Sequence, residues 1–248
     1  MKLALISDVH ANLEALRACL DHARAQGAER LAFLGDLVGY GPEPGAVVEL
    51  VRAEVERGAL AVKGNHDEAA VAGRSDTMHQ AAEQAIGWTR AHLDDAQRGF
   101  LAALPMTVRE DRLFLVHASP ELPHEWIYVT DPARAAAARD VSAPASWVFC
   151  GHVHEPVLYT QGTAARPVAF RPVSGVAIPV PAHRRWLAVV GSAGQPRDGN
   201  TAACYAMLDT DRPALTFHRV PYEWRAAAAK IRAAGLPEIL ARRLERGE

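Results

Sequence analysis

The sequence has little of what marks a secreted, membrane-spanning or nucleic-acid-coating protein. Its three cysteines, Cys19, Cys150 and Cys204, are scattered and odd in number, which excludes a disulfide framework and fits a reducing compartment. The formal net charge of −2 gives no basic surface for a nucleic-acid scaffold, although a nucleotide is still compatible as a substrate. No apolar run approaches the length of a membrane span.

The first residues also lack the features of an export signal. The apolar run in Met1–Ser7 is too short for such a signal, and Asp8 and His10 interrupt it. We therefore expect a cytoplasmic protein with no membrane partner.

Hydrophobic patterning predicts an α/β fold in the first third of the chain. Short apolar strands at 3–7, at 30–36 and within 60–67 alternate with amphipathic stretches at 12–27 and 44–58. This alternation is typical of parallel strand–helix–strand units. The strands are apolar throughout, so we expect a sheet that is covered on both faces.

Short strands dominate the second half, and no repeat, low-complexity segment or linker separates the halves. We therefore expect a second sheet within one domain that spans residues 1–248. The additions to this domain are an inserted helical segment at about 68–104, an extra hairpin at about 157–181 and C-terminal helices at about 223–246.

Polar residues that can bind metals follow five of the apolar strands directly. They are Asp8 and His10, Asp36, Asn65 to Asp67, His117, and His152 and His154. Because ligands bind beyond the carboxyl ends of strands in an open α/β sheet, we expect these side chains at one rim. Carboxylates, imidazoles and an amide together suit a pair of divalent transition-metal ions: manganese, iron, cobalt, nickel or zinc.

Each of these motifs taken alone is compatible with an ordinary turn, a helix cap or a polar loop. The motifs occur in a fixed order, and each one directly follows an apolar strand. Together they favour a site with two metal ions. Such ions stabilise the attacking and leaving oxygens of a displacement at phosphorus and generate hydroxide from water. Asp36, held between Gly35 and a turn, has the short tether that a bridging ligand needs.

The ordered set D-x-H, G-D, G-N-H-D, a lone H and G-H-x-H resembles the calcineurin-like metallophosphoesterase superfamily. The stretches SDVHANLEAL, GDLVGYGPEP and GSAGQPRDGN look most like its small bacterial and archaeal phosphodiesterase branch. The resemblance implies a four-layer α/β/β/α sandwich of two mixed β-sheets flanked by helices, with the metal site at the carboxyl ends of the strands. Two divalent ions would be the cofactors, with manganese favoured.

The resemblance also implies a role for each site residue. The ligands of the first ion would be Asp8, His10 and His154. The ligands of the second ion would be Asn65, His117 and His152. Asp36 would bridge the two ions. His66 would be the catalytic residue. It would contact the phosphate and protonate the leaving oxygen while a metal-bridging hydroxide attacks.

The chain departs from the phosphoprotein phosphatases of this superfamily, which carry G-D-x-V-D-R-G. Gly39 and Tyr40 replace the Asp that orients the catalytic histidine and the Arg that grips a phosphate. A missing Arg matters less to a singly charged diester than to a monoester dianion, so we expect a small phosphodiester substrate. Candidate substrate contacts are Tyr40, Arg197 as a replacement cation, and Asn12, for which a helix N-cap is the alternative.

Further functions are compatible with the same residues. They include hydrolysis of nucleotide pyrophosphate bonds in dinucleoside polyphosphates, hydrolysis of phosphomonoesters, and a binding module that has lost catalysis. The presence of all seven ligands and His66 counts against the binding module. The sequence is also compatible with an oligomer.

Overall fold

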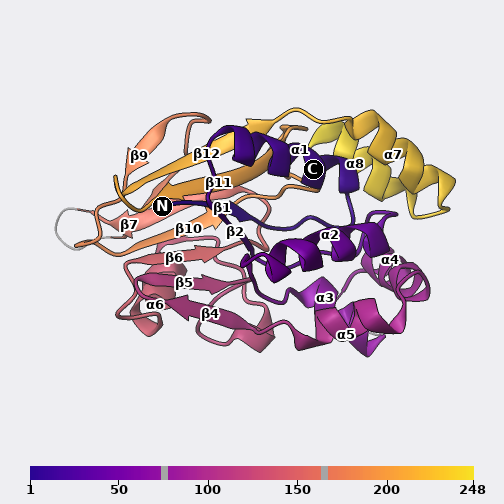
Figure 1. Cartoon of the computed structure of the whole chain (residues 1–248), viewed down its shortest axis with the longest axis horizontal. Helices are drawn as coiled ribbons and strands as arrows, with labels where there is room; N and C mark the ends of the chain where they lie inside the picture. The colour runs from indigo at the N-terminus through magenta and orange to yellow at the C-terminus, as the bar shows by residue number, and fades with distance from the viewer. Residues whose placement is uncertain (74–77, 163–166) are drawn as a thin grey trace.

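The computed structural model describes residues 1–73, 78–162 and 167–248. Residues 74–77 of the expected helical insertion and 163–166 of the expected hairpin lie outside the described residues. In the described part, two six-stranded sheets stack face to face and helices lie outside them (Figure 1).

The first sheet is mixed. Its strand order is β3 (Leu60–Ala61), β2 (Arg30–Phe33), β1 (Lys2–Ile6), β11 (Ala203–Asp209), β12 (Ala214–Val220) and β9 (Ala177–Pro179). The strands β1, β2 and β3 are parallel, as the alternating pattern predicts, and the remaining pairs are antiparallel.

The second sheet is also mixed. Its strand order is β4 (Thr107–Glu110), β5 (Leu113–Val116), β6 (Trp147–Cys150), β10 (Trp186–Val190), β7 (Pro156–Gln161) and β8 (Pro167–Phe170). The central strands β5, β6 and β10 are parallel, and β4, β7 and β8 add antiparallel pairs at the edges.

Three apolar layers hold the described stack together, because each inner strand buries both of its faces. In β1, Leu3 and Leu5 face the second sheet, and Ala4 and Ile6 face the helices on the other side. Alternate residues of a strand point to opposite faces, so an uninterrupted apolar run is what a doubly covered strand requires.

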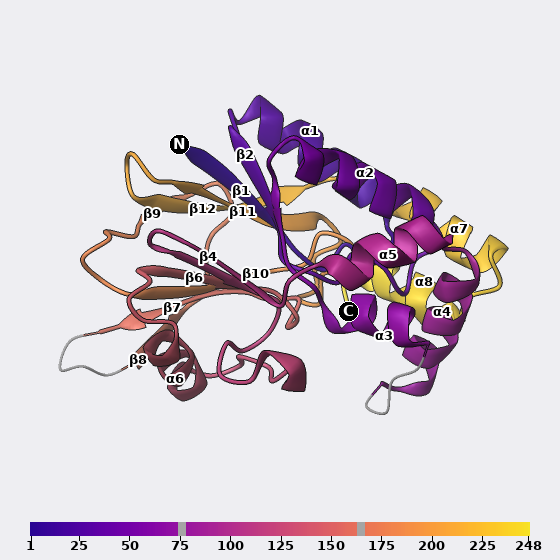
Figure 2. The same cartoon turned by 60° about the horizontal axis from the view of Figure 1, so that its bottom comes forward.

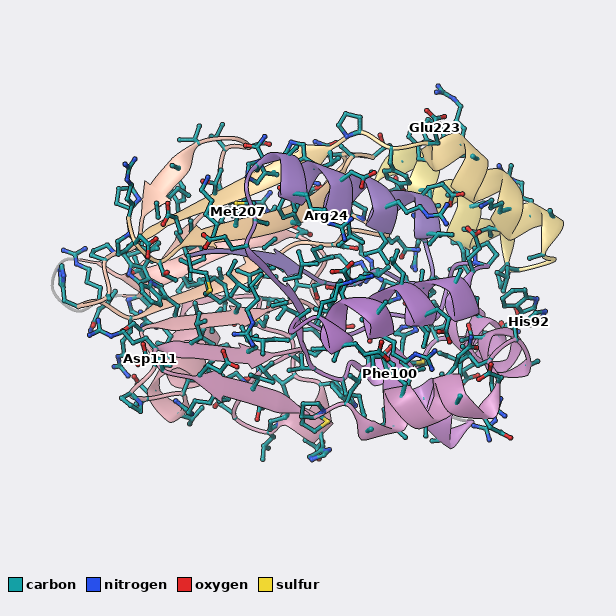
Figure 3. All side chains as sticks on the ribbon, in the orientation of Figure 1. Arg24, His92, Phe100, Asp111, Met207 and Glu223 are labelled. Atoms are coloured by element: carbon teal, nitrogen blue, oxygen red, sulfur yellow. The ribbon has the colours of Figure 1, made fainter. Side chains whose placement is uncertain are left out.

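Helices cover the outer face of each sheet (Figure 2). On the first sheet they are α1 (Leu13–Ala25) and α2 (Pro44–Glu56), and on the second sheet α6 (Pro132–Val141). Arg24 of α1 pairs with the buried Glu54 of α2 at 2.6 Å and lies between the two helices in Figure 3. The expected four-layer sandwich is thereby confirmed.

The remaining helices gather beyond one end of the sheets (Figures 1 and 2). They are α3 (Asn65–Ala72), α4 (Gln80–Ala91), α5 (Asp95–Ala103), α7 (Trp224–Ala233) and α8 (Glu238–Arg246), with a short 3₁₀ turn at Pro123–Glu125 on the second sheet's side. Among the described residues, no helix combines the length and the apolar character needed to cross a membrane.

The structure differs from the predicted elements at three places. The strand expected within 60–67 is only two residues long, and α3 begins at Asn65. The region 157–181 is shared by both sheets, since β7 and β8 pair in one and β9 joins the other. The strand β4 and the helix α6 were not predicted, because neither has a pronounced apolar face.

One histidine that is not among the predicted metal ligands is buried enough to make the stability of the fold depend on pH. His218 of β12 stacks on Tyr205 of β11 with ring centroids 4.9 Å apart, and His22 of α1 lies 5.1 Å away. Burial, together with the nearby His22, lowers the pKa of His218 from 6.5 to about 4.

His218 should therefore destabilise the fold at acid pH. Between the ordinary pKa of 6.5 and the lowered value of about 4, the unfolded chain binds a proton that the folded chain does not. The free energy of unfolding should thus fall as the pH is lowered through this window. In urea unfolding at about pH 7 and about pH 5, His218→Gln should lose less stability than the wild type. An equal loss in both proteins would contradict this.

Candidate metal centre

The turns that follow the strands bring the predicted ligands to one point. Asp8 and His10 follow β1, Asp36 follows β2, His117 follows β5, and His152 and His154 follow β6. Asn65 and His66 begin α3, which packs at the same end. The carboxylates and imidazoles are all at least 94% buried, and only Asn65 is half-buried.

Within this cluster the ligand atoms form two groups that share Asp36. In the first group, Nε2 of His154 lies 3.1 Å from Nε2 of His10 and 3.3 Å from Oδ1 of Asp8. In the second, Nε2 of His117 lies 3.1 Å from both Nδ1 of His152 and Oδ1 of Asn65.

Asp36 lies between these two groups. Its Oδ2 atom is 3.6 Å from Nε2 of His10 and 3.4 Å from Nε2 of His117. One carboxylate oxygen is therefore within reach of both groups, which is the position that a bridging ligand must take.

Backbone carbonyls orient three of the imidazoles. Nδ1 of His117 is 2.7 Å from the carbonyl of Leu34, and Nδ1 of His154 is 2.6 Å from that of Gln195. Nδ1 of His10 is 3.3 Å from the carbonyl of Val38. A neutral ring that donates from Nδ1 carries its lone pair on Nε2, so in the neutral form, which a metal ligand must take, these lone pairs converge on the carboxylates.

This donor set fits divalent metal ions. Two Nε2 lone pairs 3.1 Å apart repel each other unless a cation lies beside them. The combination of imidazole, carboxylate and amide ligands suits transition-metal ions, and a carbonyl that holds the far side of a histidine is the usual support for a metal ligand. The structure thus contains Asp/His clusters that could bind metal ions.

The turns that carry these residues are strained. Nine described residues other than glycine have positive φ. Seven of them belong to these turns: Asp8, His10, Ala11, Asp36, Tyr40, His152 and His154. Such backbone conformations are unfavourable for most side chains and persist where the surroundings over-determine them, as they do at functional sites.

The charges in the centre are strongly coupled. Burial opposes a charge on Asp36, but the imidazoles of His117 and His66 outweigh it and hold the pKa of Asp36 well below its usual range. Burial alone would lower the pKa of His117, and Asp36 instead raises it to about 9. Both shifts show that the surroundings of Asp36 favour a positive charge.

His66 is in the cluster but differs from the other histidines. Its backbone N–H donates to Oδ1 of Asp36 at 2.8 Å, while Nδ1 of its ring is buried without a hydrogen-bond partner among the described residues. A Cβ at position 39 would overlap this Nδ1, so Gly39 provides the space for the ring. Burial lowers the pKa of His66 to about 4, which leaves the ring neutral near pH 7.

The candidate substrate contacts lie in different settings. Tyr40 is buried, with its ring 4.5 Å from that of His66. Arg197 lies beside it, with Nη2 3.5 Å from the Tyr40 hydroxyl and 3.3 Å from Oε1 of Gln195. Asn12 caps α1, and its amide donates to the carbonyl of Gly194 and the hydroxyl of Tyr222. Its hydrogen bonds therefore favour the helix cap.

Asp67 is a site residue whose role the sequence did not reveal. It is fully buried, and its Oδ1 accepts the N–H groups of Leu37 and Val38 at 2.9 and 3.2 Å. Its Oδ2 accepts the N–H of Gly64 at 2.9 Å. The carboxylate thus ties the turn after Asp36 to the start of α3. The only signal in the sequence was its place in G-N-H-D.

Comparisons with known proteins point to one family. The model of the calcineurin-like phosphoesterase superfamily domain matches residues 1–213. The crystal structure of a metallophosphoesterase from Sphaerobacter thermophilus is 37% identical, with a TM-score of 0.87 over 100% of this chain and 99% of that chain.

Two curated relatives are similar over most of the chain. An uncharacterised protein of Methanocaldococcus jannaschii is 32% identical over 98% of this chain and 96% of its own length. The phosphodiesterase YfcE of Escherichia coli is 26% identical over 85% of this chain and 89% of its own length.

The contacts of Asp67 lead to a stability prediction. In Asp67→Asn, one carboxylate oxygen becomes an NH₂ group, so at least one of the three buried N–H donors faces another donor. The free energy of unfolding should fall by about 1–3 kcal/mol in urea denaturation. Asp111→Asn, in an exposed turn at φ 47° that asparagine also adopts, is the matched control and should change little. Wild-type stability in Asp67→Asn would contradict the role of Asp67.

Proposed function

The chain belongs to the calcineurin-like phosphoesterase superfamily, and from this premise we propose that it hydrolyses phosphodiesters with two divalent metal ions. The observation that carries the proposal is the convergence of two ligand groups on the single carboxylate of Asp36. Manganese is the proposed ion, because the ligands include hard oxygens as well as imidazoles.

The proposed ligands follow the two groups. One ion would be held by Asp8, His10 and His154. The other would be held by Asn65, His117 and His152, and Asp36 would bind both ions. When bound, the ions would supply positive charge to the phosphoryl oxygens and hydroxide from water near neutral pH.

The protein would contribute orientation and exclusion of water. Because the imidazoles are fixed by backbone carbonyls and the turns are buried, little reorganisation should accompany the reaction. Arg197, beside Tyr40, would add a cation for a phosphate oxygen. Its guanidinium is the substitute we propose for the Arg that Tyr40 replaces.

His66 would deliver a proton to the leaving oxygen. Its ring centroid lies 4.8 Å from that of His10, and its Nδ1 makes no competing hydrogen bond to a described residue. A phosphate anion beside the ring would favour its protonated form and so oppose the effect of burial on its pKa. Proton transfer from a positioned imidazole is the usual way to assist an alkoxide leaving group.

Charge favours a diester over a monoester. A diester has one negative charge and a monoester near neutral pH has nearly two, but Arg197 is the single cation that we place beside the metal ligands. The similarity to the Escherichia coli phosphodiesterase supports this choice.

The cytoplasmic location, the single domain over 1–248 and any oligomer stay predictions.

Metal removal tests the proposal directly. The chelator-stripped protein should not hydrolyse bis-p-nitrophenyl phosphate, and Mn²⁺ should restore the release of nitrophenol. Hydrolysis of p-nitrophenyl phosphate should be slower. Faster release from the monoester would favour a phosphomonoesterase. If diadenosine tetraphosphate were the only substrate hydrolysed, a nucleotide pyrophosphate hydrolase would be favoured. No release with Mn²⁺, Co²⁺, Ni²⁺ or Zn²⁺ from any of these substrates would favour a binding module.

Substitution of His66 separates proton transfer from metal binding. His66→Ala should keep its bound Mn²⁺ and lower kcat by roughly 100- to 10,000-fold. The loss should be smaller for p-nitrophenolate, which leaves readily, than for an alkyl leaving group, because only the latter needs the proton. Asp36→Asn is the contrasting variant and should lose metal. Unchanged turnover in a metal-loaded His66→Ala protein would rule out the assigned role.

A further inference from the structure

A cleft of about 500 Å³ adjoins the metal centre on the side of the second ligand group. The loop that follows His117, residues 119–130, forms most of its lining, and Arg134 of α6 adds to it. His152 lines this cleft and also belongs to the ligand cluster, so the cleft and the metal centre are contiguous. Its volume is in the range of small-ligand sites.

The loop sets an aromatic ring against each imidazole of the second group. Tyr128 stacks on His152 with ring centroids 4.0 Å apart and an interplanar angle of 22°. Trp126 and His117 form a T-shaped pair with ring centroids 5.8 Å apart. A backbone hydrogen bond of 3.0 Å from Ser119 to Ile127 closes the loop and holds both aromatic residues at the site.

Shielding of the imidazoles does not by itself account for these rings. A shielding ring gains most when it is buried, yet Tyr128 remains 49% exposed and contributes its remaining surface to the cleft. Half-exposed aromatic rings in a concave site are suited to stacking on another planar ring.

The charges of the lining favour an uncharged group. Arg134 brings one positive charge and Glu125 one negative charge, and the other titratable side chains of the lining are Tyr128 and two histidines. The cleft thus has no net charge to hold a second phosphate. Thr130 and the ends of Arg134 and Glu125 provide donors and acceptors for the polar edge of a planar ring.

We propose that this cleft is a nucleoside subsite, in which the base of a nucleotide-derived phosphodiester stacks on Tyr128 and Trp126 while its phosphate lies at the metal centre. The proposal rests on the proposed function for the position of the phosphate. It narrows the substrate class to esters in which at least one substituent is a nucleoside.

Binding of two phosphates that differ only in their substituent tests the subsite. AMP and methyl phosphate present the same phosphate group, and only AMP has a base. Calorimetry on the Mn²⁺-loaded protein should give a lower Kd for AMP. In Tyr128→Ala the Kd of AMP should rise about tenfold and that of methyl phosphate should stay constant, because stacking of one base is lost.

Two further variants control this comparison. Tyr128→Phe keeps the ring and should keep the preference for AMP. Leu122→Ala changes a side chain of the same loop that is 58% exposed and does not line the cleft, and it should bind both phosphates as the wild type does. Bound manganese is measured in each variant, so that damage to the metal centre is recognised.

Each outcome bears on one proposal. The nucleoside subsite would be overturned if the wild type bound the two phosphates with equal affinity, or if Tyr128→Ala weakened the binding of both equally. The ring of Tyr128 would then serve only to support His152. Since calorimetry requires no turnover, a preference for AMP without any hydrolysis would contradict the proposed function alone. Hydrolysis of bis-p-nitrophenyl phosphate without a preference for AMP would contradict the subsite alone.

Discussion

The structure depends on the burial of two carboxylates among histidine side chains whose lone pairs converge. Asp8 and Asp36 are almost completely removed from water, and Nε2 atoms approach each other at 3.1 Å. Such an arrangement is unfavourable without a cation, because a buried charge must be paired and facing lone pairs repel. The protein must therefore hold these groups in place with interactions from outside the cluster.

Those interactions come mainly from the backbone. Three carbonyls, two from the segment after β2 and one from the segment after β10, fix the imidazoles, and the buried carboxylate of Asp67 fixes the turn after Asp36. The two sheets divide the ligands, since Asp8 and Asp36 follow strands of one and His117 and His152 follow strands of the other. The apolar layer between the sheets thus determines how the two halves of the centre face each other.

The surroundings of the centre differ on its two sides. On the side of His66, Tyr40 packs against the C-terminal helices, and Arg197 reaches its hydroxyl. On the side of His152, an aromatic loop lines an open cleft. A substrate whose phosphate lies between them would meet a guanidinium on one side and planar rings on the other, which agrees with an ester of one negative charge and one aromatic substituent.

Local patterns in the chain were sufficient to predict the α/β class, most inner strands and the polar residues that follow them. An apolar run covered on both faces leaves a distinct pattern, and a polar residue directly after such a run lies where ligands bind in this class of sheet. The edge strand β4 and the helix α6 could not be predicted, because Thr107–Glu110 and the alanine-rich 132–141 bury too little apolar surface to show a period.

Which atoms meet depends instead on the packing of the whole chain. Asp36 lies between two ligand groups, Asp67 binds the turn of Leu37, and Tyr128 stacks on His152, and each of these contacts joins segments that are apart in the sequence. Local patterns report which face of a strand or helix is apolar. They carry no information on how the ends of two sheets align, because packing of the whole core determines that alignment.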